Sequence, residues 1–132
     1  MVSYGLQRRA TLRGLSCGAV SPTDVCDADP YLVRAAKHHG EPTQTPCPVC
    51  RRRPLTHVTY VFGDELGQYS GRIRRTRELE SMAHEHAAFT VYVVEVCQEC
   101  GWNHLALSYV LGDGTSRLRP PRPGRRTSVA DA

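Results

Sequence analysis

The sequence has no apolar run that approaches the ~20 residues needed for a membrane-spanning helix. Its first residues, MVSYGLQRRATLRGLSCGAV, lack the apolar core of a secretory signal peptide. We therefore expect a cytoplasmic protein with no membrane partner, in a compartment where thiols stay reduced. The HExxH motif, the nucleophile elbow and the glycine-rich phosphate loop are also missing. The sequence thus predicts a protein that is not an enzyme and has no catalytic residues.

Cysteine, in contrast, is well represented, and four of the six cysteines form two CxxC pairs. The pairs are Cys47-Pro-Val-Cys50 and Cys97-Gln-Glu-Cys100. Two intervening residues let the chain fold back, so that both sulfurs of a pair can reach one ion about 2.3 Å away. Four thiolates from two such turns make a closed tetrahedral site, which zinc fills well. We predict a structural Zn²⁺ ion bound by these four cysteines.

The other two cysteines, Cys17 and Cys26, lie nine residues apart and show no ligand spacing. A free cysteine most often behaves as a small apolar residue in the protein interior. We therefore expect both to be buried residues with a packing role.

The chain divides into three parts. A length of 132 residues fits one domain. Residues 1–45 are expected to be helical, residues 46–112 to form the zinc-bearing body, and residues 113–132 to be a disordered Arg/Pro-rich tail. From residue 115 the chain holds five arginines and one acid, whereas residues 1–114 hold twelve basic and twelve acidic residues. The excess positive charge therefore lies in the tail, where it could attract phosphate or merely keep the chain soluble.

The N-terminal part contains three helix signals. Loosely spaced apolar residues predict a helix over Tyr4–Leu15, and Ser21-Pro22 predicts a short turn that ends near Cys26. A better delimited helix follows, with Asp29 as N-cap and proline in the first turn. Gly40 is expected to end that helix in the left-handed conformation.

The body shows three strand patterns and one helix. Strands are predicted over Leu55–Phe62, Thr90–Val96 and Trp102–Leu111, and a helix from Thr76 to about Ala88. Alternation in the last strand places Leu105, Leu107, Tyr109 and Leu111 on one face. We predict an α+β fold, in which N-terminal helices accompany a three-stranded antiparallel sheet of the zinc-ribbon type with a helical insertion between its two halves.

Several motifs together resemble a small zinc-ribbon-like family of unknown function from actinobacteria. They are VCDADPYLVRAAKHHGEPT, PCPVC, VFGDELG, VYVVEVCQECGWNH and SYVLG. The resemblance spans about residues 4–112 and leaves the tail outside. It implies a cytoplasmic single-domain protein, and it supplies no catalytic residues.

Three functional classes follow from these patterns. A closed site of four thiolates favours a non-catalytic adaptor or regulator on a protein or ribonucleoprotein machine such as the ribosome or RNA polymerase. The second class is direct nucleic-acid binding, and the third is a CxxC thiol-disulfide oxidoreductase, which needs a cysteine at a helix N-terminus. The candidate partner-binding residues are Arg51, Arg52, Arg53, Arg72, Arg74, Arg75, Arg77 and Trp102.

Overall fold

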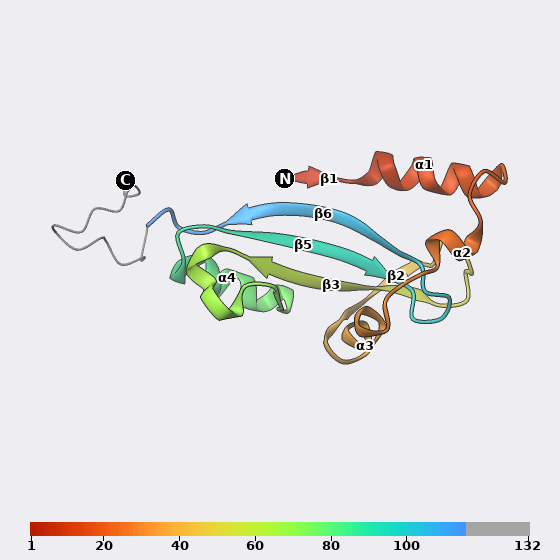
Figure 1. The fold of residues 1–132 in the computed structure, drawn as a ribbon. Helices are drawn as coiled ribbons and strands as arrows, with labels where there is room; N and C mark the ends of the chain where they lie inside the picture. The colour runs from red at the N-terminus through yellow and green to blue at the C-terminus, as the bar shows by residue number, and fades with distance from the viewer. Residues whose placement is uncertain (116–132) are drawn as a thin grey trace.

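The structure is a computed structural model, and it describes residues 1–115. Long, curved strands run side by side, with helices near both of their ends (Figure 1). In chain order the elements are β1 (Val2–Ser3), α1 (Gly5–Ser16), α2 (Pro22–Val25), α3 (Pro30–His39), β2 (Glu41–Pro46), β3 (Pro54–Phe62), the 3₁₀ helix η1 (Asp64–Tyr69), β4 (Arg72–Ile73), α4 (Thr76–Glu85), β5 (Phe89–Val96) and β6 (Asn103–Leu111).

The sheet is antiparallel and has six strands, so the α+β prediction is confirmed but the three-stranded sheet is not. The order is β1-β6-β5-β3-β2, with β4 also paired to β3. The three predicted strands form its centre as β3, β5 and β6. The prediction that residues 41–45 are helical was wrong, because β2 (EPTQTP) forms an edge strand there. This strand contains two prolines and few β-branched residues, so its sequence does not show the usual strand pattern. Such a composition is tolerated mainly at a sheet edge.

Of the caps predicted for α3, Asp29 is confirmed and Gly40 is not. Asp29 caps α3 by accepting a hydrogen bond from the Tyr31 backbone N–H. Gly40, however, has an extended conformation with φ −80° rather than a left-handed one. Glycine is needed for space instead, because a Cβ atom there would lie 2.3 Å from Cγ2 of Thr56. A side chain at residue 40 would therefore push α3 away from the sheet.

η1 and α4 cover one face of the sheet at the end that lies away from the cysteines. Leu66 of η1 and Leu79 of α4 pack on Val61, Phe89 and Val91, which point to this face. Alternation along the strands brings the paired residues of β3 and β5 to the same side. The apolar residues of α4 thus bury the end of the sheet that lies away from the cysteines.

α3 covers only the cysteine-proximal part of the opposite face. Ala35 and Ala36 pack on Val58 and Val96 near the end of the strands where the two cysteine pairs lie. Figure 1 shows α3 and α4 at opposite ends of the strands. Farther along this face, Phe62 and Val110 are exposed.

A β-bulge in β6 overturns the prediction that four apolar residues share one face. The register shifts between Val93, which pairs with Leu107, and Val94, which pairs with Leu105. Ala106 is the extra residue, so Leu105 points to the face opposite Leu107. Leu107, Tyr109 and Leu111 pack in the core, while Leu105 joins the exposed side.

α1 is attached to the sheet by a buried acid. Glu95 is 6% exposed, and its Oε2 accepts a hydrogen bond from Nε1 of Trp102 at 2.7 Å. The same oxygen forms an ion pair with Nε of Arg8 at 2.6 Å. Leu12 and Leu15 of α1 pack on the same buried cluster as Trp102. The N-terminal helix therefore lies against the cysteine-bearing end of the sheet. Within residues 1–115, no helix is both long and apolar enough to span a membrane.

Replacing Arg8 by alanine should destabilise the protein by about 1–3 kcal/mol, because a buried carboxylate loses its only cationic partner among the described residues. Chemical denaturation of the full-length chain measures this free energy of unfolding. The matched control is Arg9→Ala, which removes an exposed arginine of the same helix and should change stability by less than about 0.5 kcal/mol. Equal effects of the two substitutions would contradict the anchoring role of Arg8.

Candidate metal centre

Two cysteine turns of the same shape lie at one end of the sheet. The first connects β2 to β3, and the second connects β5 to β6. In the first, the Arg51 backbone N–H donates to the carbonyl oxygen of Cys47 at 3.1 Å; in the second, the Gly101 N–H donates to that of Cys97 at 3.0 Å. Backbone N–H groups also point at sulfur, from Val49 to Sγ of Cys47 at 3.4 Å and from Glu99 to Sγ of Cys97 at 3.4 Å. These hydrogen bonds orient the sulfurs toward one point.

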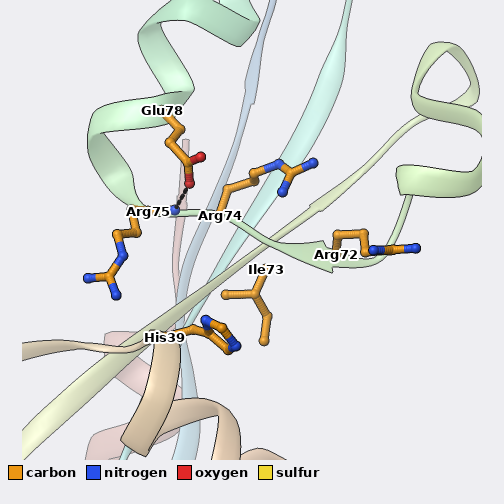
Figure 2. A pocket seen from close by; sticks show the side chains of 6 residues that line it. All are labelled: His39, Arg72, Ile73, Arg74, Arg75 and Glu78. Carbon is orange, nitrogen blue, oxygen red and sulfur yellow. Dashed lines mark hydrogen bonds between the residues drawn. The ribbon is translucent and has the colours of Figure 1, made fainter.

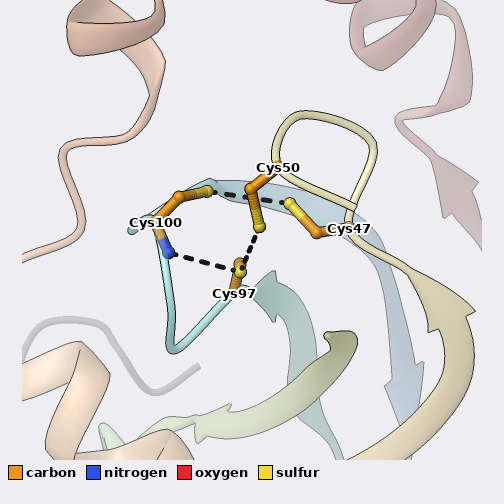
Figure 3. A group of neighbouring side chains, drawn as sticks. All are labelled: Cys47, Cys50, Cys97 and Cys100. Carbon is orange, nitrogen blue, oxygen red and sulfur yellow. Dashed lines mark hydrogen bonds between the residues drawn. The ribbon is translucent and has the colours of Figure 1, made fainter. Parts of the chain in front are cut away.

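The four predicted ligands are brought together (Figure 3). All four sulfurs lie within 4.8 Å of one another. The Cys47–Cys100 sulfur distance is 3.7 Å, and the Cys50–Cys97 distance is 3.6 Å. A tetrahedron with metal–sulfur bonds of about 2.3 Å has edges of about 3.8 Å. The sulfur arrangement therefore has the dimensions of a tetrahedral site and could hold a metal ion.

The residue after each pair has a left-handed backbone. Gly101 has φ +91° and Arg51 has φ +57°. Glycine adopts this conformation without steric cost, whereas an arginine is strained by it. A Cβ atom on residue 101 would also approach the carbonyl oxygen of Cys26 to 2.9 Å. The two turns thus share a left-handed residue after the second cysteine, but only the second turn has the glycine that this conformation favours.

Apolar side chains enclose the inner half of the site. Cys47 and Cys97 are buried together with Leu55 and Trp102, and Cys50 and Cys100 are half-buried. The residues that pack around this cluster come from both turns and from the N-terminal helices, and they include Leu12, Leu15, Val25, Cys26 and Val49. The helices thus form part of the wall of the candidate centre.

Burial and hydrogen bonds shift the thiol pKa values in opposite directions. Burial raises the pKa of Cys47 and of Cys97, and it raises that of Cys100 to about 12. Desolvation also acts upward on Cys50, but hydrogen bonds from the Arg52 backbone and from the Cys97 thiol outweigh it and lower the pKa of Cys50 to about 6. These shifts favour the ionised form of Cys50 and the protonated form of Cys47, Cys97 and Cys100.

The two remaining cysteines differ from the prediction. Cys17 is exposed rather than buried, and its thiol donates to the carbonyl oxygen of Gly14 at 3.5 Å. Cys26 is half-buried, and its sulfur lies 3.5 Å from that of Cys100. No spacing rule links residues 74 apart in the sequence, so Cys26 could not be assigned to the centre without the fold.

The predicted arginines do not form one surface. Arg51, Arg52 and Arg53 are exposed beside the first turn, and Arg53 lies 4.0 Å from Glu99. Arg72 pairs with Val61 near the other end of β3. The length of that strand separates the groups by roughly 25 Å. The arginines of residues 72–77 therefore do not surround the cysteine cluster.

A hollow of about 420 Å³ lies beside this second group, lined by His39, Arg72, Ile73, Arg74, Arg75 and Glu78. Figure 2 shows the side chain of Arg75 extending away from those of Arg72 and Arg74. Oε1 of Glu78 accepts a hydrogen bond from the Arg75 backbone N–H at 2.7 Å and so caps α4. The hollow thus lacks the convergent cations that would select an anion.

Trp102 cannot serve as a partner-binding residue in this fold. Its side chain is 0% exposed, stacks on the His104 ring and donates to Glu95. The inclusion of Trp102 among the candidate binding residues was therefore wrong. Its indole stabilises the core beneath the second cysteine turn.

The fold and the cluster together define a small α+β protein with four cysteines that could bind a metal ion. Comparison with known families places it more narrowly. Residues 1–125 match the model of a family of unknown function, DUF5318, and the chain belongs to this family. The motifs indicated a resemblance over about residues 4–112, without the tail. The family match extends to residue 125 and so includes the first part of the tail.

The chain is similar to uncharacterized proteins of mycobacteria. It is 47% identical over 129 residues to Rv0049 of Mycobacterium tuberculosis (strain ATCC 25618 / H37Rv), a match that covers 98% of this chain and 93% of the relative. The same values hold for Mb0050 of Mycobacterium bovis (strain ATCC BAA-935 / AF2122/97). No solved structure matches the chain.

If the cluster holds zinc, replacing Cys47 or Cys100 by serine should unfold the cysteine-bearing end of the protein. Apparent binding free energies of structural zinc are about 10–16 kcal/mol, which equals or exceeds the stability of a small domain. Thermal unfolding and metal analysis of the purified variants measure the effect. Cys17→Ala is the control and should melt like the parent, because Cys17 is exposed. A Cys100→Ser variant with the parental melting temperature would contradict the metal assignment.

The left-handed residues provide a second pair of variants. Arg51→Gly should stabilise the protein by about 1 kcal/mol, since glycine adopts the φ of +57° without strain. Gly101→Ala should destabilise it by about 1–3 kcal/mol, because strain adds to the contact with Cys26. Denaturant unfolding of the metal-loaded variants tests both signs. Destabilisation by Arg51→Gly would show that the arginine side chain contributes more than its backbone strain costs.

Metal binding should release about three protons per ion near pH 7.5, because three thiols with raised pKa values are protonated and Cys50 is largely ionised. Affinity should therefore rise with pH through the neutral range and fall as the thiols retain their protons at lower pH. Calorimetric titration with Zn²⁺ in buffers of different ionisation enthalpy gives the proton count. A release close to zero would mean that the cluster is already ionised.

Proposed function

We propose that this protein is a non-catalytic structural-zinc protein that acts as an adaptor or regulator on a larger protein assembly. The single observation that supports it is the all-sulfur cluster with the dimensions of a closed tetrahedral site. Zinc favours four thiolates in this geometry, and a complete quartet leaves no coordination position for a substrate. In this proposal the ion would stabilise the fold, the protein would act through its surface, and its location would be the reducing cytoplasm.

The surface that best fits a partner is the exposed part of the sheet beyond α3. Five residues, which we call the aromatic patch, line a shallow hollow of about 610 Å³: Tyr60, Phe62, Tyr92, Val94 and Leu105. None is charged, and Tyr60 and Val94 lie at the edge of the cluster that α3 forms with the sheet. The rings of Phe62 and Tyr92 meet edge to face with centroids 5.5 Å apart. Rigid aromatic pairs of this kind are common at the energetic centres of protein interfaces.

A protein partner suits the aromatic patch better than nucleic acid does. The patch carries no cation of its own, whereas phosphate contacts supply much of the affinity for nucleic acid. Residues 1–114 are also electrically neutral in total. We therefore favour an apolar protein surface, such as a component of a ribonucleoprotein machine, as the partner.

Direct nucleic-acid binding is the second candidate, because exposed aromatic side chains on a sheet can stack on bases. The three exposed arginines after Cys50 could add phosphate contacts. Fluorescence anisotropy with single-stranded and duplex oligonucleotides, repeated over a range of salt, separates the candidates. A slope of about −0.9 per phosphate contact on duplex would favour nucleic acid, and weak, salt-independent binding would favour the adaptor.

Substitutions in the aromatic patch test the adaptor role. Phe62→Ser and Tyr92→Ser should each lower recovery of a specific partner from nuclease-treated extract by about tenfold, or about 1.4 kcal/mol. Quantitative mass spectrometry of affinity-purified complexes measures this loss. Leu6→Ser is the matched control, since Leu6 is 73% exposed on α1, outside the patch. Recovery that is equal for all three variants would exclude the patch as the docking surface.

A thiol oxidoreductase is disfavoured by the placement of the pairs. Both connect strands, and neither stands at a helix N-terminus, where a reactive thiolate would be stabilised. Release of zinc by a mercurial reagent, measured beside insulin reduction, separates the two functions. Catalytic turnover of insulin by metal-free protein would overturn the non-catalytic proposal.

A further inference from the structure

A fifth cysteine lies beside the candidate metal centre without belonging to it. Sγ of Cys26 is 3.5 Å from Sγ of Cys100, about as close as the paired sulfurs within the cluster, which lie 3.6 and 3.7 Å apart. Cys26 is not one of the four residues whose sulfurs are all within 4.8 Å of one another. The quartet is therefore complete without it. One ligand sulfur thus has a spare thiol as its neighbour.

Backbone contacts hold Cys26 in this position. The Ala28 N–H donates to the carbonyl oxygen of Gly101 at 3.0 Å, and Nδ2 of Asn103 donates to Oδ1 of Asp27 at 3.0 Å. The absence of a side chain on Gly101 lets the carbonyl of Cys26 approach closely. Residues 26–28 therefore lie against residues 101–103, so the meeting of the two sulfurs does not depend on side-chain flexibility alone.

The geometry also allows a covalent bond. A disulfide requires a sulfur–sulfur distance of about 2.05 Å, so the two sulfurs must approach by about 1.5 Å. Cys26 and Cys100 are both half-buried, as is Cys50, whereas Cys47 and Cys97 are buried. A small oxidant in solvent therefore has a path to this pair. Cys17, which is exposed, has no other cysteine near it among the sulfur contacts of the described residues.

We propose that Cys26 and Cys100 form an oxidation-sensitive pair, in which a hydroperoxide converts the two sulfurs to a disulfide and so removes Cys100 from the ligand quartet. The predicted loss of metal rests on the proposed zinc centre, whereas the closeness of the two sulfurs that form the disulfide does not. Cys26 acts as a resolving thiol, and the modification site is one that the CxxC motifs do not reveal.

The chemistry balances with hydrogen peroxide as the oxidant. As a ligand of the proposed zinc ion, Cys100 would be held as a thiolate; its sulfur attacks one peroxide oxygen, the O–O bond breaks, and hydroxide leaves, so that Cys100 becomes a sulfenic acid. The Cys26 sulfur then attacks the Cys100 sulfur, the S–O bond breaks, and the thiol proton leaves with the hydroxyl group as water. Two electrons pass from the two sulfurs to the two peroxide oxygens. Three of the four sulfur donors then remain.

The test follows two readouts in full-length, zinc-loaded protein treated with hydrogen peroxide. The first disulfide is located by mass mapping of peptides under non-reducing conditions, and released zinc is followed with a chromogenic chelator. The Cys26–Cys100 disulfide should form first. Cys26→Ala should lose zinc about tenfold more slowly than the parent, because the one neighbouring thiol outside the quartet, which resolves the sulfenic acid, is missing. Cys17→Ala is the matched control and should behave like the parent.

Two results would overturn the proposal. One is a first disulfide within either CxxC pair, and the other is zinc release from Cys26→Ala at the rate of Cys17→Ala. Cys26→Ser, which preserves size and a hydrogen-bond donor, guards against a packing defect and should match Cys26→Ala in its zinc-release rate. Metal analysis before oxidation tests the zinc centre itself. Because the disulfide map can be read with or without metal, a protein that lacks zinc would refute the proposed function and leave the pair separately testable.

Discussion

The convergence of four sulfurs at one end of the sheet is the constraint on which the rest of the molecule depends. β3 leaves the first cysteine turn, β5 enters the second, and β6 leaves it, so the cluster holds the three central strands together where their hairpins begin. The buried sulfurs of Cys47 and Cys97 also form part of an apolar cluster with Leu55 and Trp102. The candidate metal ligands therefore also contribute to core packing at this end.

The N-terminal helices extend this centre rather than forming a separate arm. Leu12, Leu15 and Val25 pack on the cluster, and Arg8 reaches the buried carboxylate that also binds Trp102. A chain of this length buries a modest core, so the apolar cluster and the ion pair at one end can supply a large part of the stability. The same packing places Cys26 beside Cys100. The packing of the N-terminal helices on the sheet therefore also brings two cysteine sulfurs close together.

The two faces of the sheet are covered to different extents, and the less covered face carries the aromatic patch. α4 and η1 cover the face that carries Val61 and Val91, whereas α3 covers only part of the other. The bulge at Ala106 turns Leu105 out of the core and onto the aromatic patch. The cysteine cluster and the aromatic patch thus lie in different parts of the molecule.

Much of the architecture was predictable because its signals are local. The CxxC spacing, the Asp29 cap and the β-branched runs of β3 and β5 each act within a few residues. Local signals did not reveal β2, whose prolines are tolerated only because it lies at an edge, or the two-residue strands β1 and β4. The tail expected over residues 113–132 lies almost wholly outside the described residues, which end at Thr115.

The sequence by itself determined the four candidate ligands and the α+β class, because the ligands follow from turn geometry and the class from periodicity along the chain. The tertiary structure alone decided that Trp102 is buried, that Leu105 lies on the face opposite Leu107 and that Cys26 meets Cys100. These outcomes depend on contacts between distant segments and on the register of the β-strands, and neither is encoded in the spacing of neighbouring residues.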